Sequence, residues 1–233
     1  MSLITEMFNV FAALGSGDWW TMRPALAADG AWLAGFVVAL VGGLLVMVIY
    51  NLFPIIDRHL ERGVTVWTYL AMAGIIFFSV LHRFGQTLEI PWAVNTPLVA
   101  WSATIPPLFF MVMAWFGCSY NVRLRTHLSF SEFRSAMPRW AQMACLTLDA
   151  LLWFAFAVMI IVTSSRIFVS SGANFRIVSG TDDTMLWWFQ VTVPIAFILM
   201  AGRVFQNWFD DWRNFRSGEP LIKQAVLGEG ETA

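Results

Sequence analysis

Five long apolar stretches, almost free of charge, constrain this chain more than any other feature of its sequence. They run over residues 32–53, 64–81, 98–120, 141–165 and 185–202. Asp149 is the only acidic or basic residue that falls within them. A helix rises about 1.5 Å per residue, so about 20 apolar residues cross a hydrocarbon core about 30 Å thick. Each stretch therefore has a length that suits one membrane-spanning helix.

The alternative is a soluble protein with five buried helices, and the sequence argues against it. Such helices need polar residues at helical spacing in order to meet water, and these stretches lack them. Only 12% of the residues are charged, against roughly 25% in an average soluble domain. The net charge of −1 gives no basic surface for a nucleic acid. The sequence predicts an all-α integral membrane protein, a bundle of about five transmembrane helices that is surrounded by membrane lipids and has no nucleic-acid partner.

The basic residues predict which side of the membrane each end of the chain occupies. If the N-terminus lies outside, the inner segments hold 10 of the 14 basic residues, namely Arg58, Arg62, Arg123, Arg125, Arg134, Arg139, Arg203, Arg213, Arg216 and Lys223. The outer segments then hold the other 4, which are Arg23, Arg83, Arg166 and Arg176. Short cytoplasmic segments are enriched in Arg and Lys. We therefore expect the N-terminus outside and the C-terminus inside.

Two terminal segments flank the spans. Residues 1–30 are expected to form a periplasmic tail in which Ile4, Met7, Phe8, Phe11 and Leu14 are spaced for one helical face. Two interpretations stay open for this tail, a helix that lies flat at the membrane interface and a frayed end. Residues 31–53 form the first span, and residues 217–233 are expected to be a cytoplasmic tail.

The residues give no sign of catalytic, cofactor or metal chemistry. The chain has no P-loop, nucleophile elbow or zinc-protease motif. Cys118 and Cys145 fall within spans on the reducing side, where small apolar packing is the usual role of a thiol. Of the histidines, only His59 and His127 share a side of the membrane, and both fall outside the apolar stretches. A membrane-anchor subunit of a redox or haem-containing complex remains the alternative function, because it also has about five spans and few charges.

Two features inside the spans invite a functional interpretation. Asp149 falls close to the middle of the membrane, where a charge is costly unless it is paired, neutral or beside water. We expect it to be a structural hydrogen-bond partner rather than part of a proton relay, because a relay needs several polar groups in series. Pro106 and Pro107 predict a kink or a local break in the third span.

Several short motifs, in order, carry a resemblance to a known family. They are Leu81-His82-Arg83-Phe84, Trp101-Ser102, the run from Phe116 to Arg123, Thr126-His127-Leu128, Met137-Pro138 and Val193-Pro194. From Glu61 onward the chain resembles the small permease subunit of TRAP transporters, the DctQ-like family. It departs from the family pattern in two ways. Ala103-Thr104 replace a carboxylate that follows Trp-Ser, and residues 31–53 add a span before the usual four-helix core, here residues 54–216.

The resemblance implies a function and a set of partners. The small subunit of this family scaffolds and anchors a large permease, which uses a cation gradient to take up an organic acid or similar small solute delivered by a periplasmic substrate-binding protein. It also implies a non-enzymatic protein of a bacterial or archaeal cytoplasmic membrane, without a cofactor. The candidate family-motif or subunit-interface residues are Arg83, Trp101, Gly117, Arg123 and His127.

Overall fold

The computed structural model describes residues 2–95, 101–125, 137–181 and 183–221. The helices in these ranges are α1 (Leu3–Ser16), α2 (Trp19–Ala27), α3 (Gly30–Leu52), α4 (Pro54–Thr87), α5 (Pro91–Asn95), α6 (Trp101–Leu124), α8 (Arg139–Ala173), α9 (Trp187–Gln190) and α10 (Thr192–Ser217). Five helices are long and apolar enough to cross a membrane: α3, α4, α6, α8, and α9 together with α10. The predicted all-α, five-span architecture is confirmed.

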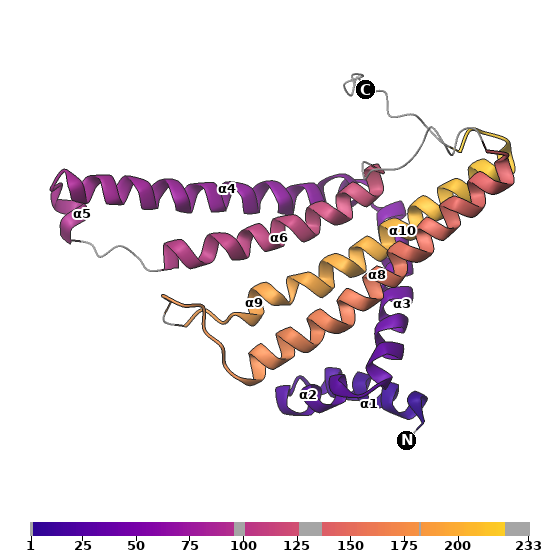
Figure 1. Ribbon diagram of the computed structural model, residues 1–233, viewed down its shortest axis with the longest axis horizontal. Coiled ribbons are helices and arrows are strands. Elements are labelled where there is room, and N and C mark those ends of the chain that lie inside the picture. Colours follow the sequence, from indigo (N-terminus) through magenta and orange to yellow (C-terminus); the bar gives the residue numbers. More distant parts are fainter. Residues whose placement is uncertain (1, 96–100, 126–136, 182, 222–233) are drawn as a thin grey trace.

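Two long helical hairpins and one crossing helix make up the bundle. Figure 1 shows α4 lying beside α6 and α8 lying beside α10, with α3 running across the α8–α10 pair. Helix α10 contacts α3, α6 and α8. It is therefore the central helix among α3, α6 and α8, and α4 packs on α6.

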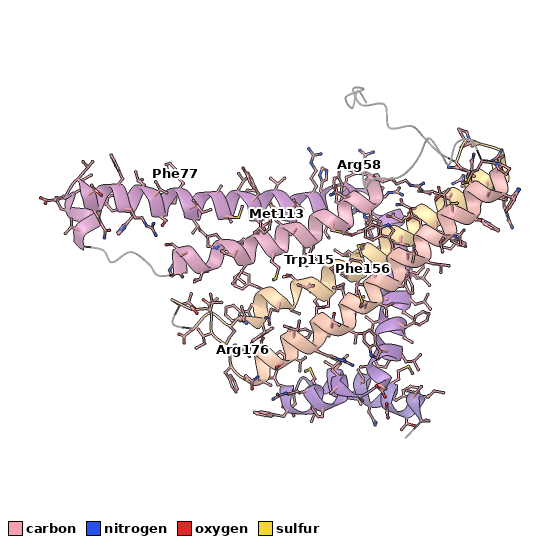
Figure 2. All side chains as sticks on the ribbon, viewed as in Figure 1. Arg58, Phe77, Met113, Trp115, Phe156 and Arg176 are labelled. Atoms are coloured by element: carbon pink, nitrogen blue, oxygen red, sulfur yellow. The ribbon has the colours of Figure 1, made fainter. Side chains whose placement is uncertain are left out.

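An aromatic cluster forms the middle of the core. The ring of Phe197 on α10 lies 5.2 Å from the ring of Trp115 on α6 and 5.6 Å from the ring of Phe156 on α8. Trp115 and Phe156 are labelled in Figure 2, on two helices that meet α10 from different sides. Tilted and edge-on ring pairs of this kind add to the apolar packing that joins three spans.

Glycines allow α3 to approach α10 closely. A Cβ atom at Gly202 would lie 2.5 Å from Cγ1 of Val46, and one at Gly43 would lie 3.0 Å from Cβ of Ala201. A Cβ atom at Gly42 would lie 2.9 Å from Cγ2 of Ile198. Small residues at such positions let membrane helices pack backbone to backbone. The glycines of α3 are thus used inside the subunit to hold the additional span against the core.

Two helices are much longer than the apolar stretches within them. Helix α4 has 34 residues and α8 has 35, or about 50 Å each at 1.5 Å per residue. Polar residues continue both helices beyond the apolar part, so hydropathy alone marked their ends too early.

The expected local break in the third span was wrong, because α6 is one helix that contains Pro106 and Pro107. Both prolines fall in its first two turns, and the expected kink stays a prediction.

The N-terminal segment folds into two capped helices. Ser2 caps α1, and Asp18 caps α2 through a hydrogen bond from the backbone N–H of Trp20. Gly17 ends α1 with a φ of +68°, a conformation that glycine adopts without a steric cost. The position of this pair at the membrane surface stays a prediction. Most of the predicted tail 217–233 lies outside the described residues.

Candidate functional site

A buried arginine on the central helix organises the polar residues of the bundle. Arg203 lies in α10 and is 0% exposed. Its Nε donates to both carboxylate oxygens of Glu61, at 2.9 and 3.1 Å, and its Nη2 lies 2.8 Å from Oε2 of the same residue. Nη1 donates to the Asp57 carboxylate and, at 2.9 Å, to Oε1 of Gln206. Nη2 also donates to the Asp57 carbonyl at 2.8 Å. All three nitrogen atoms of the guanidinium therefore donate hydrogen bonds within the chain.

Glu61, the main partner of this arginine, also accepts hydrogen bonds from two other spans. It is 0% exposed. Its Oε1 accepts hydrogen bonds from the hydroxyl of Tyr50 at 3.2 Å and from the hydroxyl of Ser119 at 2.8 Å. The guanidinium of Arg203 also lies 4.0 Å from the centre of the Tyr50 ring. Residues of α3, α4, α6 and α10 thus meet at one point, which we call the ionic cluster: Tyr50, Asp57, Glu61, Ser119, Arg203 and Gln206.

Burial makes the pairing within the ionic cluster energetically important. Moving charges out of water is costly, and the cost is offset only when geometry and hydrogen bonds are good. Asp57 lies in the first turn of α4, where the helix dipole favours negative charge. The Asp57 side chain remains 28% exposed, so its charge also contacts solvent. The cluster joins four spans, and Arg203 is the basic residue that pairs with both of its carboxylates.

Ion pairs continue from the cluster toward the C-terminal end of α6. Arg123 forms a 2.8 Å ion pair with Asp210 and donates to Oδ1 of Asn207 at 2.9 Å. Arg125 forms a 2.8 Å ion pair with Asp211. These contacts fasten the end of α6 to α10.

Arg139, the first residue of α8, forms hydrogen bonds with the backbone at the C-terminal end of α10. Its guanidinium donates to the carbonyl oxygens of Asn214, Phe215, Gly218 and Glu219. The last carbonyls of a helix have no partner within the helix, and a basic side chain also suits the negative end of its dipole. Arg139 therefore caps α10 and closes the α8–α10 hairpin.

The structure places the predicted site residues in different parts of the fold. Arg123 belongs to the ion pairs beside the ionic cluster, and Gly117 faces Thr65 of α4 across the α4–α6 contact. Arg83 and Trp101 lie at the other ends of α4 and α6, far from the cluster. Asp149 is half-buried on α8. His127 lies outside the described residues. The roles expected of these residues remain predictions.

Sequence reasoning missed Glu61 and Arg203, which are the centre of the site. Both fall just outside the apolar stretches, so a hydropathy boundary assigns them to loops. Arg203 directly follows Gly202, the last residue of the fifth stretch, and Glu61 precedes the second stretch by three positions. The available signal was helical spacing, because Glu61 shares one face of α4 with Thr65 and Thr68.

Among the described residues, the side chains that could bind a metal ion or a haem are not grouped together. The described ranges contain no group of three or more His, Cys, Asp or Glu side chains placed to hold a metal ion. His59 and His82 lie on the same helix, about 34 Å apart at the helical rise, which prevents them from holding one haem together. Cys118 and Cys145 are free thiols.

The spans and the ionic cluster define a class of protein, a multi-span α-helical membrane protein whose internal charges hold its helices together. The family model for the DctQ component of tripartite ATP-independent periplasmic transporters matches residues 72–214, more than half of the chain. The chain belongs to this family, and it is the small membrane subunit of such a transporter in the inner membrane. No curated protein and no solved structure gives a significant match. The resemblance found in the sequence is confirmed.

Proposed function

We propose that this subunit is a scaffold that anchors the large permease and moves no solute by itself. The solute, in this proposal an organic acid or a similar small molecule, is delivered by a periplasmic binding protein and crosses through the permease at the expense of a cation gradient. The chain belongs to a family of tripartite transporter components, and this supports the proposal that a large permease and a binding protein are its partners. Such a family is composed of transporter components rather than enzymes.

One observation carries the proposal. Among the described residues, three charged side chains are buried, namely Glu61, Arg203 and Asp211. Each of them is in an ion pair with another residue of this chain. A charged solute needs polar groups to replace its water as it crosses the hydrocarbon core. The buried charges here are committed to holding helices together, which favours a scaffold over a solute path.

The surface of the subunit agrees with a role in contact with a larger membrane partner. None of the residues in the most apolar part of α4 is buried by the chain itself. Phe77 and Phe78, for example, are 63% and 68% exposed, and Figure 2 shows Phe77 on the side of α4 that faces away from α6. Such a surface can contact lipid or another membrane helix without a polar penalty.

Co-purification tests this proposal. The subunit, tagged at its C-terminus, is co-expressed with the large permease of the same transporter and purified in a mild detergent, with an unrelated tagged multi-span protein as the control. We expect the permease to elute with the subunit in one complex and to be absent from the control. Separate elution of the two proteins would contradict the scaffold. A Soret band in the purified subunit would support the haem-anchor alternative instead.

A further inference from the structure

Helix α1 presents three different faces, each with its own chemistry. One face is buried, with Val10 and Ala13 at 1% and 8% exposure, in an apolar cluster with residues of α2, α3 and α8. A second face is polar and exposed, and it carries Thr5, Asn9 and Ser16. The third face is apolar and carries Ile4, Phe8 and Phe11, which follow one another at helical spacing; Phe11 is half-buried at the edge of this face, against the apolar cluster. Ile4 and Phe8 are 60% and 63% exposed.

One hydrogen bond fixes how these faces are oriented along the first span. Glu6 lies on the buried face, between Ala13 and Val10 around the helix, and its carboxylate accepts a hydrogen bond of 3.0 Å from the backbone N–H of Gly30. Gly30 is the first residue of α3. The apolar face lies roughly opposite Glu6 around the helix, so it is directed away from this contact with the outer end of α3. Figure 1 shows α1 and α2 lying across the beginning of α3, roughly at right angles to it.

Helix α2 fixes this arrangement to α8. The ring of Trp19 packs on Gly172, where a Cβ atom would come within 2.7 Å of it, and lies 5.1 Å from the ring of Trp187. Arg166 of α8 donates from Nε to the carbonyl of Leu26 at 2.7 Å, and its guanidinium lies 5.4 Å from the centre of the Trp32 ring. Trp and Arg gather where a protein meets the headgroups of a bilayer. These contacts fix α2 and the start of α3 to α8, and α1 packs on both α2 and α3.

We propose that α1 is a membrane-surface helix whose face of Ile4, Phe8 and Phe11 is inserted among the lipids of the leaflet in which α3 begins. The charge bias predicts that this leaflet is the periplasmic one. The occupant is lipid because α3 must enter the bilayer directly beside this face. Separate polar and apolar exposed faces also match a helix buried about 5–10 Å into the headgroup boundary. The inference does not depend on the proposed function, and α1 lies outside the residues that match the family.

Depth measurement with spin labels tests this inference. The full chain, with Cys118 and Cys145 replaced by alanine, receives a nitroxide at Phe8→Cys or at the matched control Asn9→Cys. Each protein is reconstituted into vesicles of phosphatidylethanolamine and phosphatidylglycerol. Both positions are exposed and adjacent, so neither substitution disturbs the core, but they lie on different faces of α1. Collisions with oxygen report the lipid phase, and collisions with a water-soluble nickel chelate report the aqueous phase.

The two labels are expected to differ. The label at position 8 should collide mainly with oxygen, at a depth of about 5–10 Å, whereas the label at position 9 should collide mainly with the nickel chelate. If both labels collide mainly with the nickel chelate, α1 lies in water and the inference is overturned. If the label at position 8 is shielded from both reagents, protein covers this face, and the inference is likewise overturned.

Discussion

Arg203 is the residue whose loss should cost the fold most, because two carboxylates depend on it. It is fully buried, whereas Arg123, which also pairs with a carboxylate of another span, has a side chain that is 32% exposed. Breaking a buried pair from one side leaves an uncompensated charge and costs about 3–5 kcal/mol. Exposed pairs contribute about 0–1 kcal/mol. The same chemical change should therefore have different effects at the two positions.

The first prediction compares Arg203→Gln with Arg123→Gln. We expect the buried substitution to lower the free energy of unfolding by about 3–5 kcal/mol and the exposed one by less than about 1 kcal/mol. Adding Glu61→Gln to Arg203→Gln should recover part of the loss, because it removes an unpaired carboxylate. Thermal unfolding in detergent, followed by tryptophan fluorescence, measures all three variants. Equal melting temperatures for Arg203→Gln and Arg123→Gln would refute the assigned role of the ionic cluster.

The second prediction concerns Asp149 on α8. If its role is a structural hydrogen bond, Asp149→Asn should preserve assembly with the permease and most of the transport activity, because an amide can still form hydrogen bonds. The measurement is solute uptake by the reconstituted complex, with complex assembly checked by gel filtration. A variant that assembles normally but has lost uptake would instead indicate a proton relay.

At the scale of the helices, hydropathy predicted where spans exist but not where helices end. Each of the five apolar stretches corresponds to a helix, because crossing the hydrocarbon core requires apolar residues. The ends of α4 and α8 could not be predicted in this way, since polar residues continue a helix once it reaches water. Asp57 and Glu61 consequently belong to α4 rather than to a loop. Proline spacing was also misleading in α6, where tertiary packing keeps the helix continuous.

The third prediction tests the contact between α3 and α10. Gly202→Ala places a methyl group 2.5 Å from Cγ1 of Val46, so the two helices must separate. Such overpacking costs about 1–3 kcal/mol. The control is Gly74→Ala on α4, where a Cβ atom meets nothing within 4 Å and alanine should stabilise the helix by about 0.5–1 kcal/mol. We expect the melting temperature to fall for Gly202→Ala and to stay the same or rise for Gly74→Ala. A fall for Gly74→Ala with no fall for Gly202→Ala would contradict the close contact between α3 and α10.

At the scale of the whole molecule, the ionic cluster could not be predicted from local sequence. Glu61 and Arg203 are 142 positions apart, and Tyr50 and Ser119 come from two further spans. No local spacing rule joins such residues. The sequence did predict that arginines crowd one end of the spans, and the ionic cluster and the ion pairs of Arg123 and Arg125 lie at that end. The short motifs between Leu81 and Pro194 were sufficient to find the family, because they can be compared by their order along the chain without knowledge of contacts.

The fourth prediction is the orientation of the chain. The bias of basic residues places Ser16 outside and Ser217 inside, and both are exposed at the ends of helices. In intact cells, a membrane-impermeant thiol reagent should label Ser16→Cys and spare Ser217→Cys. Permeabilised cells provide the control in which both are labelled. Labelling of Ser217→Cys but not of Ser16→Cys in intact cells would contradict this orientation and indicate the opposite one.

The central claim is that this subunit holds a transporter together without transporting. Its most direct test is uptake by proteoliposomes that contain the subunit alone, the permease alone, or the complex of both. An inward sodium gradient is imposed, and the cognate binding protein is supplied outside with its radiolabelled solute. The account predicts gradient-dependent uptake by the complex and none above empty liposomes by the subunit alone. Gradient-dependent uptake by the lone subunit would contradict it.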